Sequence, residues 1–314
     1  MVKTSVLIGN LELKNRVLVA SGTFGYGDDC SDLVNVDELG GIVTKSLSLK
    51  PRDGNPAPRI TETSSGMLNS IGLANIGVKR FVSDKLPVIR EYDTAIIANI
   101  AASSIDEYAQ VLELLEKEEG VDGYEINVSC PNVKEGGLSF GTNRELTATI
   151  TRRLRSLTRK PLIIKLTPNV THISEFAKAV EDEGADAVSV INTLIGMAVD
   201  VGTRKPKLST VTGGLSGPAI KPVALAKVYE VSRVVKIPIL GIGGIVTSED
   251  ALEFLIVGAS AVQIGTANYI DPSTGVRVAE GLRTFCEEHG FQDVGDVVGS
   301  LEAREDLSVL QSWL

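Results

Sequence analysis

The stretch LIIKLTPNVTHISEFAKAVEDEGADAVSVI, residues 162–191, decides the fold that this sequence predicts. It opens with the apolar run LIIKL (162–166) and closes with a second one, AVSVI (187–191). Runs that are nearly all apolar are typical of parallel strands buried on both faces. The segment between them has a helical pattern, and Gly184-Ala185-Asp186 has the form of a helix end, where glycine adopts the left-handed conformation. The stretch therefore predicts a strand–helix–strand unit.

The same unit recurs along the whole chain. The apolar runs are RVLVA (16–20), GIVTK (41–45), AIIANI (95–100), GYEINV (123–128), LIIKL, AVSVI, IPILGI (237–242) and AVQIG (261–265). Helix starts are indicated by the capping-box spacing of Ser104 with Glu107, Thr142 with Glu145 and Thr247 with Asp250, and by Pro222. Gly258-Ala259-Ser260 is a second helix end. Eight such units predict a single (β/α)8 TIM barrel, with residues 1–314 as one domain.

An N-terminal hairpin and three long connections complete this prediction. SVLIG (5–9) and LELKN (11–15) are expected to form an N-terminal β-hairpin that closes the barrel floor. Residues 46–76, 129–142 and 193–220 are longer than usual connections and are expected to be long active-site loops. The alternative fold, an open doubly wound sheet, would carry GxGxxG after its first strand if it bound a dinucleotide. GTFGYG (22–27) has the wrong spacing and GIGG (241–244) lacks the third glycine, so the barrel is favoured.

Composition limits the class of partner. The formal net charge of −9, from 31 Lys and Arg against 40 Asp and Glu, disfavours duplex nucleic acid or an anionic membrane as the main partner. Cys30, Cys130 and Cys286 lack CxxC spacing, so we expect neither disulfides nor a metal site. No run approaches the ~20 apolar residues of a membrane span, and the N-terminus lacks a signal-peptide pattern. A soluble, cytoplasmic protein with a small ligand is expected.

Polar residues and glycines stand where the predicted strands end, which is where barrels carry their reactive groups. These positions are Ser21, Gly22, Lys45, Ser46, Asn99, Asn127, Cys130, Asn132, Lys165, Asn192, Thr193, Gly243, Gly244, Gly265 and Thr266. Asn99, Asn127 and Lys165 lie within otherwise apolar strands, where an unpaired amide or ammonium is costly. They need partners, which are either a bound ligand or neighbouring backbone and a barrel carboxylate such as Glu125.

The glycines indicate a phosphate site. Barrels often bind phosphate between the loops after strands seven and eight, where backbone N–H groups and a helix N-terminus face the anion. GIGGIVTSED (241–250) and QIGTAN (263–268) occupy these loops, and Ser216-Gly217-Pro218 precedes them. The alternative is that glycine only permits tight turns. A phosphate site with Lys45 and Lys165 suits flavin mononucleotide (FMN), because an ammonium stabilises the negative charge of the reduced ring. A Schiff-base lysine, as in aldolases, is the competing interpretation.

Motifs over nearly the whole chain closely resemble those of the dihydroorotate dehydrogenases, specifically the class 1 enzymes with a catalytic cysteine. They are SGTFG (21–25), VTKSLSLKPRDGNPAPRITET (43–63), GMLNSIGLAN (66–75), NVSCPNVKEGG (127–137), KLTPNV (165–170), VINTLIGM (190–197), TGGLSGPAIKP (212–222) and GIGGI (241–245). GMLNSIGL, KEGGLSFGT and TGGLSGPAIKP are more similar to the catalytic subunit of the NAD-linked class 1B enzymes than to the fumarate-using class 1A. The membrane-associated class 2 enzymes resemble the chain less, since they have serine in place of Cys130.

The resemblance implies oxidation of (S)-dihydroorotate to orotate in pyrimidine (UMP) biosynthesis. Cys130 would take the C5 proton, with its thiol pKa lowered from ~8.5, and FMN the C6 hydride, while loop 129–142 closes over the substrate. The implied catalytic residues are Cys130 and Lys45. The implied substrate-binding residues are Lys45, Asn69, Ser70, Ile71, Gly72, Leu73, Asn127, Asn132, Asn192 and Thr193. The implied FMN contacts are Ser21, Lys45, Ser46, Asn99, Asn127, Lys165, Ile191, Gly217, Gly243, Gly244, Gly265 and Thr266.

The electron acceptor requires a second protein. Three cysteines are too few for an iron–sulfur cluster, and a dinucleotide fingerprint is absent from the sequence. The subclass resemblance implies a partner subunit that carries FAD and a 2Fe–2S cluster, two of each chain forming a heterotetramer around a homodimer of this one. Three alternatives remain: a homodimeric fumarate-using enzyme, a tRNA dihydrouridine synthase, which the acidic charge disfavours, and a flavin-binding barrel kept as a non-catalytic subunit.

Overall fold

The computed structural model describes residues 2–129 and 140–302, and a closed barrel of eight parallel strands lies at its centre. The barrel strands are β3 (Val17–Val19), β4 (Gly41–Val43), β7 (Ala95–Ile100), β8 (Gly123–Asn127), β9 (Leu162–Leu166), β10 (Ala187–Val190), β15 (Ile239–Ile242) and β16 (Ala261–Ile264). They follow one another around the barrel in chain order, and β16 pairs with β3 to close it. Each lies within one of the eight predicted apolar runs, so the (β/α)8 prediction is confirmed.

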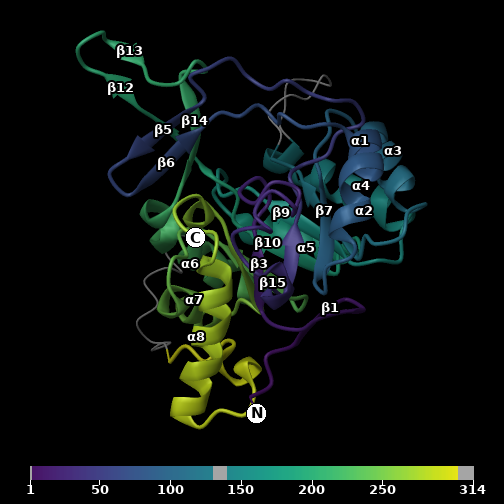
Figure 1. The fold of residues 1–314 in the computed structure, drawn as a ribbon, viewed down its shortest axis with the longest axis vertical. Helices are drawn as coiled ribbons and strands as arrows, with labels where there is room; N and C mark the ends of the chain where they lie inside the picture. Colours follow the sequence, from purple (N-terminus) through teal and green to yellow (C-terminus); the bar gives the residue numbers. More distant parts are fainter. Residues whose placement is uncertain (1, 130–139, 303–314) are drawn as a thin grey trace.

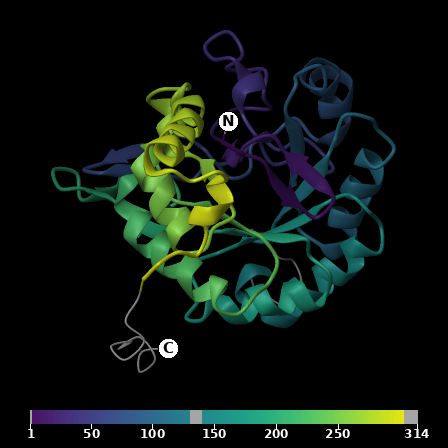
Figure 2. The same cartoon turned by 90° about the horizontal axis from the view of Figure 1, so that it is seen from below.

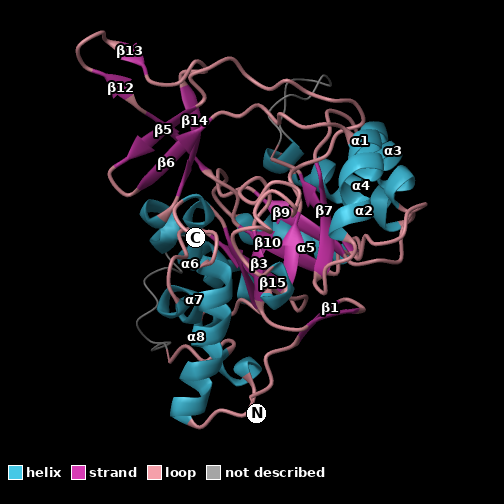
Figure 3. Cartoon of the chain, viewed as in Figure 1, coloured by secondary structure: helices cyan, strands magenta, loops and turns pink. Residues whose placement is uncertain are grey.

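Helices surround the barrel, as Figures 1 and 3 show. They are α1 (Val78–Arg80), α2 (Leu86–Ile89), α3 (Ile105–Leu115), α4 (Arg144–Arg155), α5 (Ile173–Asp182), α6 (Lys221–Ser232), α7 (Ser248–Ile256) and α8 (Thr274–His289). A π-helical turn, Phe81–Lys85, joins α1 to α2. Short 3-10 turns lie at Val36–Glu38, Phe140–Thr142, Pro218–Ile220, Thr266–Tyr269 and Val294–Val297. The unit between β3 and β4 has only the first of these turns in place of an α-helix.

Two of the three predicted capping positions are confirmed. Ser104 caps α3, and Thr247 and Asp250 form a reciprocal capping box on α7. The prediction for Thr142 is wrong by one residue: Asn143 is the N-cap of α4, and its Oδ1 accepts from the N–H of Leu146 at 3.0 Å. Thr142 ends the preceding 3-10 turn, so the extended backbone that an N-cap needs begins only at the next residue.

The predicted hairpin closes the floor of the barrel. It consists of β1 (Val6–Ile8) and β2 (Leu11–Leu13), and Figure 2 shows it in purple across the lower opening. Ile8 and Leu13 are fully buried against one apolar side chain from each of seven barrel strands. These are Leu18, Val43, Ile97, Ile163, Ala187, Leu240 and Ala261. The floor end of the barrel interior is therefore an apolar core.

A second sheet lies above the carboxyl ends of the barrel strands. Its order is β11 (Leu194–Met197), β14 (Thr212–Ser216), β6 (Gly66–Asn69) and β5 (Ile60–Thr63), all antiparallel (Figure 1). A two-stranded extension, β12 (Val199–Asp200) with β13 (Lys205–Pro206), projects beyond it. The segments expected to be loops, 46–76 and 193–220, therefore contain the strands of one shared sheet. Within the described ranges, no helix combines the length and the apolar character that a membrane crossing requires.

Candidate active site

The carboxyl ends of the eight parallel strands meet at one rim, and most of the predicted site residues lie there. Ser21 follows β3, Lys45 and Ser46 follow β4, and Ile191 to Thr193 follow β10. Asn99, Asn127 and Lys165 lie in the last residues of β7, β8 and β9. Gly243 and Gly244 follow β15, and Gly265 and Thr266 follow β16. The barrel thus brings together positions spread over some 245 residues of chain, as in Asn268 Nδ2 donating to Thr23 Oγ1.

The second sheet brings Asn69 to the same region. Asn69 is opposite Gly214 in the pairing of β6 with β14, and its Nδ2 donates weakly to the Gly214 carbonyl at 3.4 Å. A Cβ on Gly214 would lie 2.2 Å from Thr193 Oγ1, so Thr193 packs directly against this strand. Asn69 and Thr193 are therefore neighbours of one glycine. The predicted substrate-binding segments from the loops after β4 and β10 meet through that pairing.

The segment Ser70–Leu73 continues from Asn69 and is held in a defined shape. Asn55 donates through its N–H to the Ile71 carbonyl at 3.1 Å and through Nδ2 to the Ser70 carbonyl at 2.9 Å. Gly72 has φ +72, and a Cβ there would lie 2.6 Å from the Asn55 nitrogen, so glycine is required. The hydroxyl of Ser70 is buried and has no hydrogen-bond partner among the described residues. Its hydrogen-bonding capacity is available to a ligand.

Asn127 and Asn192 also meet. Asn127 Oδ1 accepts from Asn192 Nδ2 and from the N–H of Ser129, both at 3.2 Å. The Tyr108 hydroxyl donates to the Asn127 carbonyl at 2.6 Å, which fixes the end of β8. Cys130 and Asn132, together with most of the loop 129–142, lie outside the described residues. Their predicted roles stay predictions.

A buried polar layer crosses the barrel beneath these amides. Glu125 on β8 is fully buried, and its Oε1 accepts from Asn99 Nδ2 at 2.7 Å and from Lys165 Nζ at 3.3 Å. Its Oε2 accepts from Ser189 Oγ at 2.7 Å and from Gln263 Nε2 at 2.8 Å. Burial by itself raises the pKa of Glu125, but the Lys165 ammonium and the three neutral donors together hold that pKa below its ordinary value.

In this layer, the buried polar residues that the sequence placed inside apolar strands have hydrogen-bond partners. Lys165 pairs with the carboxylate that the sequence pointed to, and Asn99 bonds to the same group and accepts from Ser46 Oγ at 2.6 Å. Sequence reasoning did not single out Ser189 and Gln263. The signal was present, since each is the one polar residue in an apolar strand, AVSV and AVQI.

Lys45 differs from Lys165 in its surroundings. It is half-buried at the end of β4, and its backbone N–H donates to the Gly25 carbonyl at 2.8 Å. Across residues 2–129 and 140–302, its ammonium has neither an ion-pair partner nor a hydrogen-bond acceptor. A half-buried charge without a partner is costly. Lys45 is therefore suited to bind an anionic or hydrogen-bonding ligand.

The glycine loops have structural reasons to be glycine. Gly243 has φ +139 and Gly244 has φ +76, and a Cβ on Gly244 would lie 2.8 Å from the Gly217 carbonyl oxygen. Gly217 itself has φ +93 and packs against Gly66. The tight-turn interpretation thus holds for these three residues. It does not exclude a phosphate, because Gly217 leads through a 3-10 turn into α6, Gly243 and Gly244 precede α7, and the hydroxyls of Thr266 and Ser216 are hydrogen-bonded at 2.8 Å.

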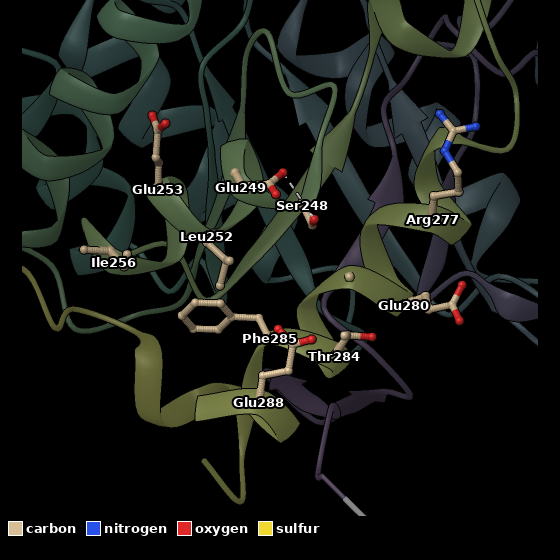
Figure 4. A pocket seen from close by; sticks show the side chains of 11 residues that line it. Ser248, Glu249, Leu252, Glu253, Ile256, Arg277, Glu280, Thr284, Phe285 and Glu288 are labelled. Carbon is tan, nitrogen blue, oxygen red and sulfur yellow. Dashed lines mark hydrogen bonds between the residues drawn. The ribbon is translucent and has the colours of Figure 1, made fainter. Parts of the chain in front are cut away.

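One surface groove lies away from this rim. It measures about 560 Å³ and runs between the outer helices α7 and α8, as Figure 4 shows, with Leu252 beside Phe285. Four glutamates line it: Glu249, Glu253, Glu280 and Glu288. None of the predicted site residues does. Among the residues that the structure describes, no cluster of three or more His, Cys, Asp or Glu side chains could hold a metal ion.

Comparisons with known proteins identify what the chain is similar to. The family model described as dihydroorotate dehydrogenase matches residues 1–286. The "Dihydroorotate dehydrogenase B (NAD(+)), catalytic subunit" of Geotalea uraniireducens is 51% identical over 297 residues, 95% of this chain and 97% of the relative. The protein of the same name from Bacteroides thetaiotaomicron is 47% identical over 302 residues, 96% of this chain and 100% of the relative. The solved structure of a DHODH from Eimeria tenella in complex with ferulenol superimposes with a TM-score of 0.77 at 22% identity, covering 95% of this chain and 88% of the other. At that identity the superposition supports the fold alone.

Proposed function

The chain belongs to the dihydroorotate dehydrogenase family, and from this premise we propose that it is the catalytic subunit of an NAD-linked member. It oxidises (S)-dihydroorotate to orotate in pyrimidine biosynthesis. One observation carries the proposal to this chain: the amides of Asn69, Asn127 and Asn192 gather where the barrel strands end, together with the ammonium of Lys45, which has no partner among residues 2–129 and 140–302. We propose further that residues 1–314 form one domain that acts in the cytoplasm.

The proposed substrate site is made of donors and acceptors that match the substrate. Dihydroorotate presents alternating N–H and C=O groups and one carboxylate, and an asparagine side chain can both donate and accept. Asn127 and Asn192 fix each other through one hydrogen bond, so each retains part of its capacity for a ligand. The buried Ser70 hydroxyl and the Lys45 ammonium add a donor and a positive charge. Asn132 completes the proposed set from the part of the chain outside the described residues.

The residues at the rim fit FMN. Their fit rests on the Lys45 ammonium, which has no acceptor within the described ranges, and on the open space beside Gly265, where an added Cβ would meet no described atom nearer than 3.8 Å. The residues proposed to hold the cofactor are Ser21, Lys45, Ser46, Asn99, Asn127, Lys165, Ile191, Gly217, Gly243, Gly244, Gly265 and Thr266. When bound, FMN supplies the acceptor for the hydride that leaves C6 of dihydroorotate.

The chain's own part in the reaction is proton removal and orientation. Cys130 is proposed to take the proton from C5 as a thiolate, and the amide pairs hold the ring so that this proton faces the sulfur. Lys45 is proposed to contact both substrate and cofactor and to stabilise negative charge as it develops. The loop 129–142 is proposed to exclude water while the proton moves.

The relatives are named catalytic subunits, which supports a partner for this chain as well. We propose that the partner carries FAD and a 2Fe–2S cluster and that two of each chain form a heterotetramer around a homodimer of this one. The reasoning is that the chain has three cysteines, whereas a cluster usually takes about four.

Anaerobic mixing of the FMN-loaded chain with dihydroorotate tests the activity. The flavin absorbance should bleach, artificial acceptors should reoxidise it, and NAD should be reduced only after the partner subunit is added. Rapid NAD reduction by the pure chain would contradict the two-subunit proposal, and efficient turnover with fumarate would assign the chain to the fumarate-using class. A flavin that stays oxidised would exclude the enzyme altogether.

A further inference from the structure

The ionised state of Glu125 follows from its partners. A carboxylate offers about four acceptor positions, and those of Glu125 are filled by donors from β7, β9, β10 and β16. The amide nitrogens of Asn99 and Gln263 and the ammonium of Lys165 can only donate. Of the four donors only the Ser189 hydroxyl can also accept, so a protonated Glu125 could keep its partners only by donating to Ser189. The carboxylate form accepts all four bonds, and the Lys165 ammonium beside it favours that form.

Glu125 is also the only buried counter-charge that Lys165 has in the described part of the chain. The buried charged side chains among the described residues are Arg16, Glu125 and Lys165. Arg16 precedes β3 at the opposite end of the barrel, where it bonds to the Ser260 carbonyl and to Asp293. Among the described residues predicted for the site, the other charged one is Lys45, which has the same sign as Lys165, and Lys221 at the start of α6 is paired with Asp250 and Glu253. Loss of the Glu125 charge would leave the Lys165 ammonium buried and unpaired.

Lys165 has donors to spare for a ligand. It is 5% exposed and donates one hydrogen bond to Glu125. An ammonium has three N–H donors, and no second acceptor is found for Lys165 among residues 2–129 and 140–302. Asn99 is similar, since one hydrogen of its Nδ2 is used by Glu125 while its Oδ1 accepts from Ser46. Glu125 thus anchors two side chains without saturating either.

We infer that Glu125 is a positioning residue for the flavin, holding Lys165 charged and Lys165 and Asn99 in place without touching the cofactor itself. The inference rests on the proposed function, because only there are Lys165 and Asn99 FMN contacts. Its consequence is specific. Burial favours the neutral amine over the ammonium when the counter-charge is absent. Without Glu125, the positive charge beside the flavin becomes dependent on pH.

Titration of the apo chain with FMN, followed by quenching of flavin fluorescence, tests this consequence. In the wild type and in the control Ser189→Ala, which removes one neutral donor from the same carboxylate, the Kd should change less than about threefold between about pH 6.5 and 9.5. In Glu125→Gln it should rise at least about tenfold over that range. In Lys165→Met the Kd for FMN should be high at both pH values. A Glu125→Gln profile parallel to the wild type, or a Ser189→Ala profile like that of Glu125→Gln, would overturn the inference.

A measurement without flavin separates this inference from the proposed function. In the apo chain labelled with ¹³C at lysine Cε, the Lys165 signal is identified by its loss in Lys165→Met. At about pH 9.5 it should report an ammonium in the wild type and an amine in Glu125→Gln. An ammonium in both overturns the positioning role, whereas a wild type that binds no FMN refutes only the cofactor proposal. If Glu125→Gln does not fold, Glu125→Asp retracts the carboxylate by one methylene and should shift the signal the same way; an unchanged signal overturns the inference.

Discussion

Replacement of Gly244 by alanine should destabilise the chain even without any ligand. Gly244 has φ +76, and an added Cβ would lie 2.8 Å from the Gly217 carbonyl oxygen, 2.9 Å from Lys221 Cβ and 3.1 Å from the Lys221 nitrogen. The left-handed conformation costs a residue with a Cβ about 1–2 kcal/mol. Forcing an atom into a packed site adds about 1–3 kcal/mol, since backbone atoms cannot move aside cheaply. The free energy of unfolding should therefore fall by about 2–5 kcal/mol.

Gly290 supplies a control with nearly the same φ. It has φ +77, and an added Cβ would meet no atom within 4 Å. Gly290→Ala carries only the conformational cost of about 1–2 kcal/mol, so urea unfolding of the two apo variants should differ by about 1–3 kcal/mol. FMN affinity should fall in Gly244→Ala alone, because the displaced Gly217 belongs to the proposed phosphate loops. A difference below about 0.5 kcal/mol would refute the argument that close packing requires glycine here.

Three further predictions concern the proposed base Cys130, the hairpin at the barrel floor and the carboxylate of Asp250. Cys130→Ala should bind FMN and orotate yet reduce the flavin at least about 10²-fold more slowly in stopped-flow absorbance, while Cys30→Ala should not slow it; near-normal rates in the former would remove Cys130 as the base. Leu13→Ala should lower the free energy of unfolding by about 2–5 kcal/mol, against about 0.5 or less for the exposed Leu7→Ala of the same hairpin, and equal effects would contradict the buried floor. Burial raises the pKa of Asp250, but Lys221 and the N–H groups of Val246 and Thr247 outweigh burial, so the pKa lies below its ordinary 3.8. The stability that the ionised Asp250 contributes is present above pH 3.8 and is lost on acidification. Between about pH 5 and 3 the free energy of unfolding should therefore fall faster for the wild type than for Asp250→Asn, and parallel curves would contradict the role of Asp250.

The eight strands and the closure of the barrel could be predicted from the sequence because their signals are local. Runs such as LIIKL and AVQIG carry their apolar pattern within five residues, and a strand buried on both faces needs nothing else to be recognised. Thr247 with Asp250 is a capping box that spans three residues, and it forms as expected. The misplaced cap of α4 shows the limit of such signals, since Thr142 and Asn143 are both good caps and only the backbone of the preceding turn selects the second.

Which residues lie at the rim of the barrel could also be predicted from the sequence. Parallel strands place all their carboxyl ends on one side, so residues that follow apolar runs had to converge once the barrel was assigned. Asn127 meeting Asn192 is a direct result. The identity of Cys130 as the proposed base rests on the resemblance to the family.

Only the tertiary structure decided which of these groups bond to one another. Asn69 and Gly214 are 145 residues apart, and the pairing of their strands turned two expected loops into one sheet. Glu125 receives donors from four other strands, and no spacing along the chain specifies which polar residues of a closed barrel face inward at the same height. That height depends on the register of neighbouring strands, which an all-apolar run leaves undefined because every residue in it is equally suited to burial. The sequence therefore predicts the strands, their order and the residues at the rim. The partners of each buried charge are fixed only when the barrel closes.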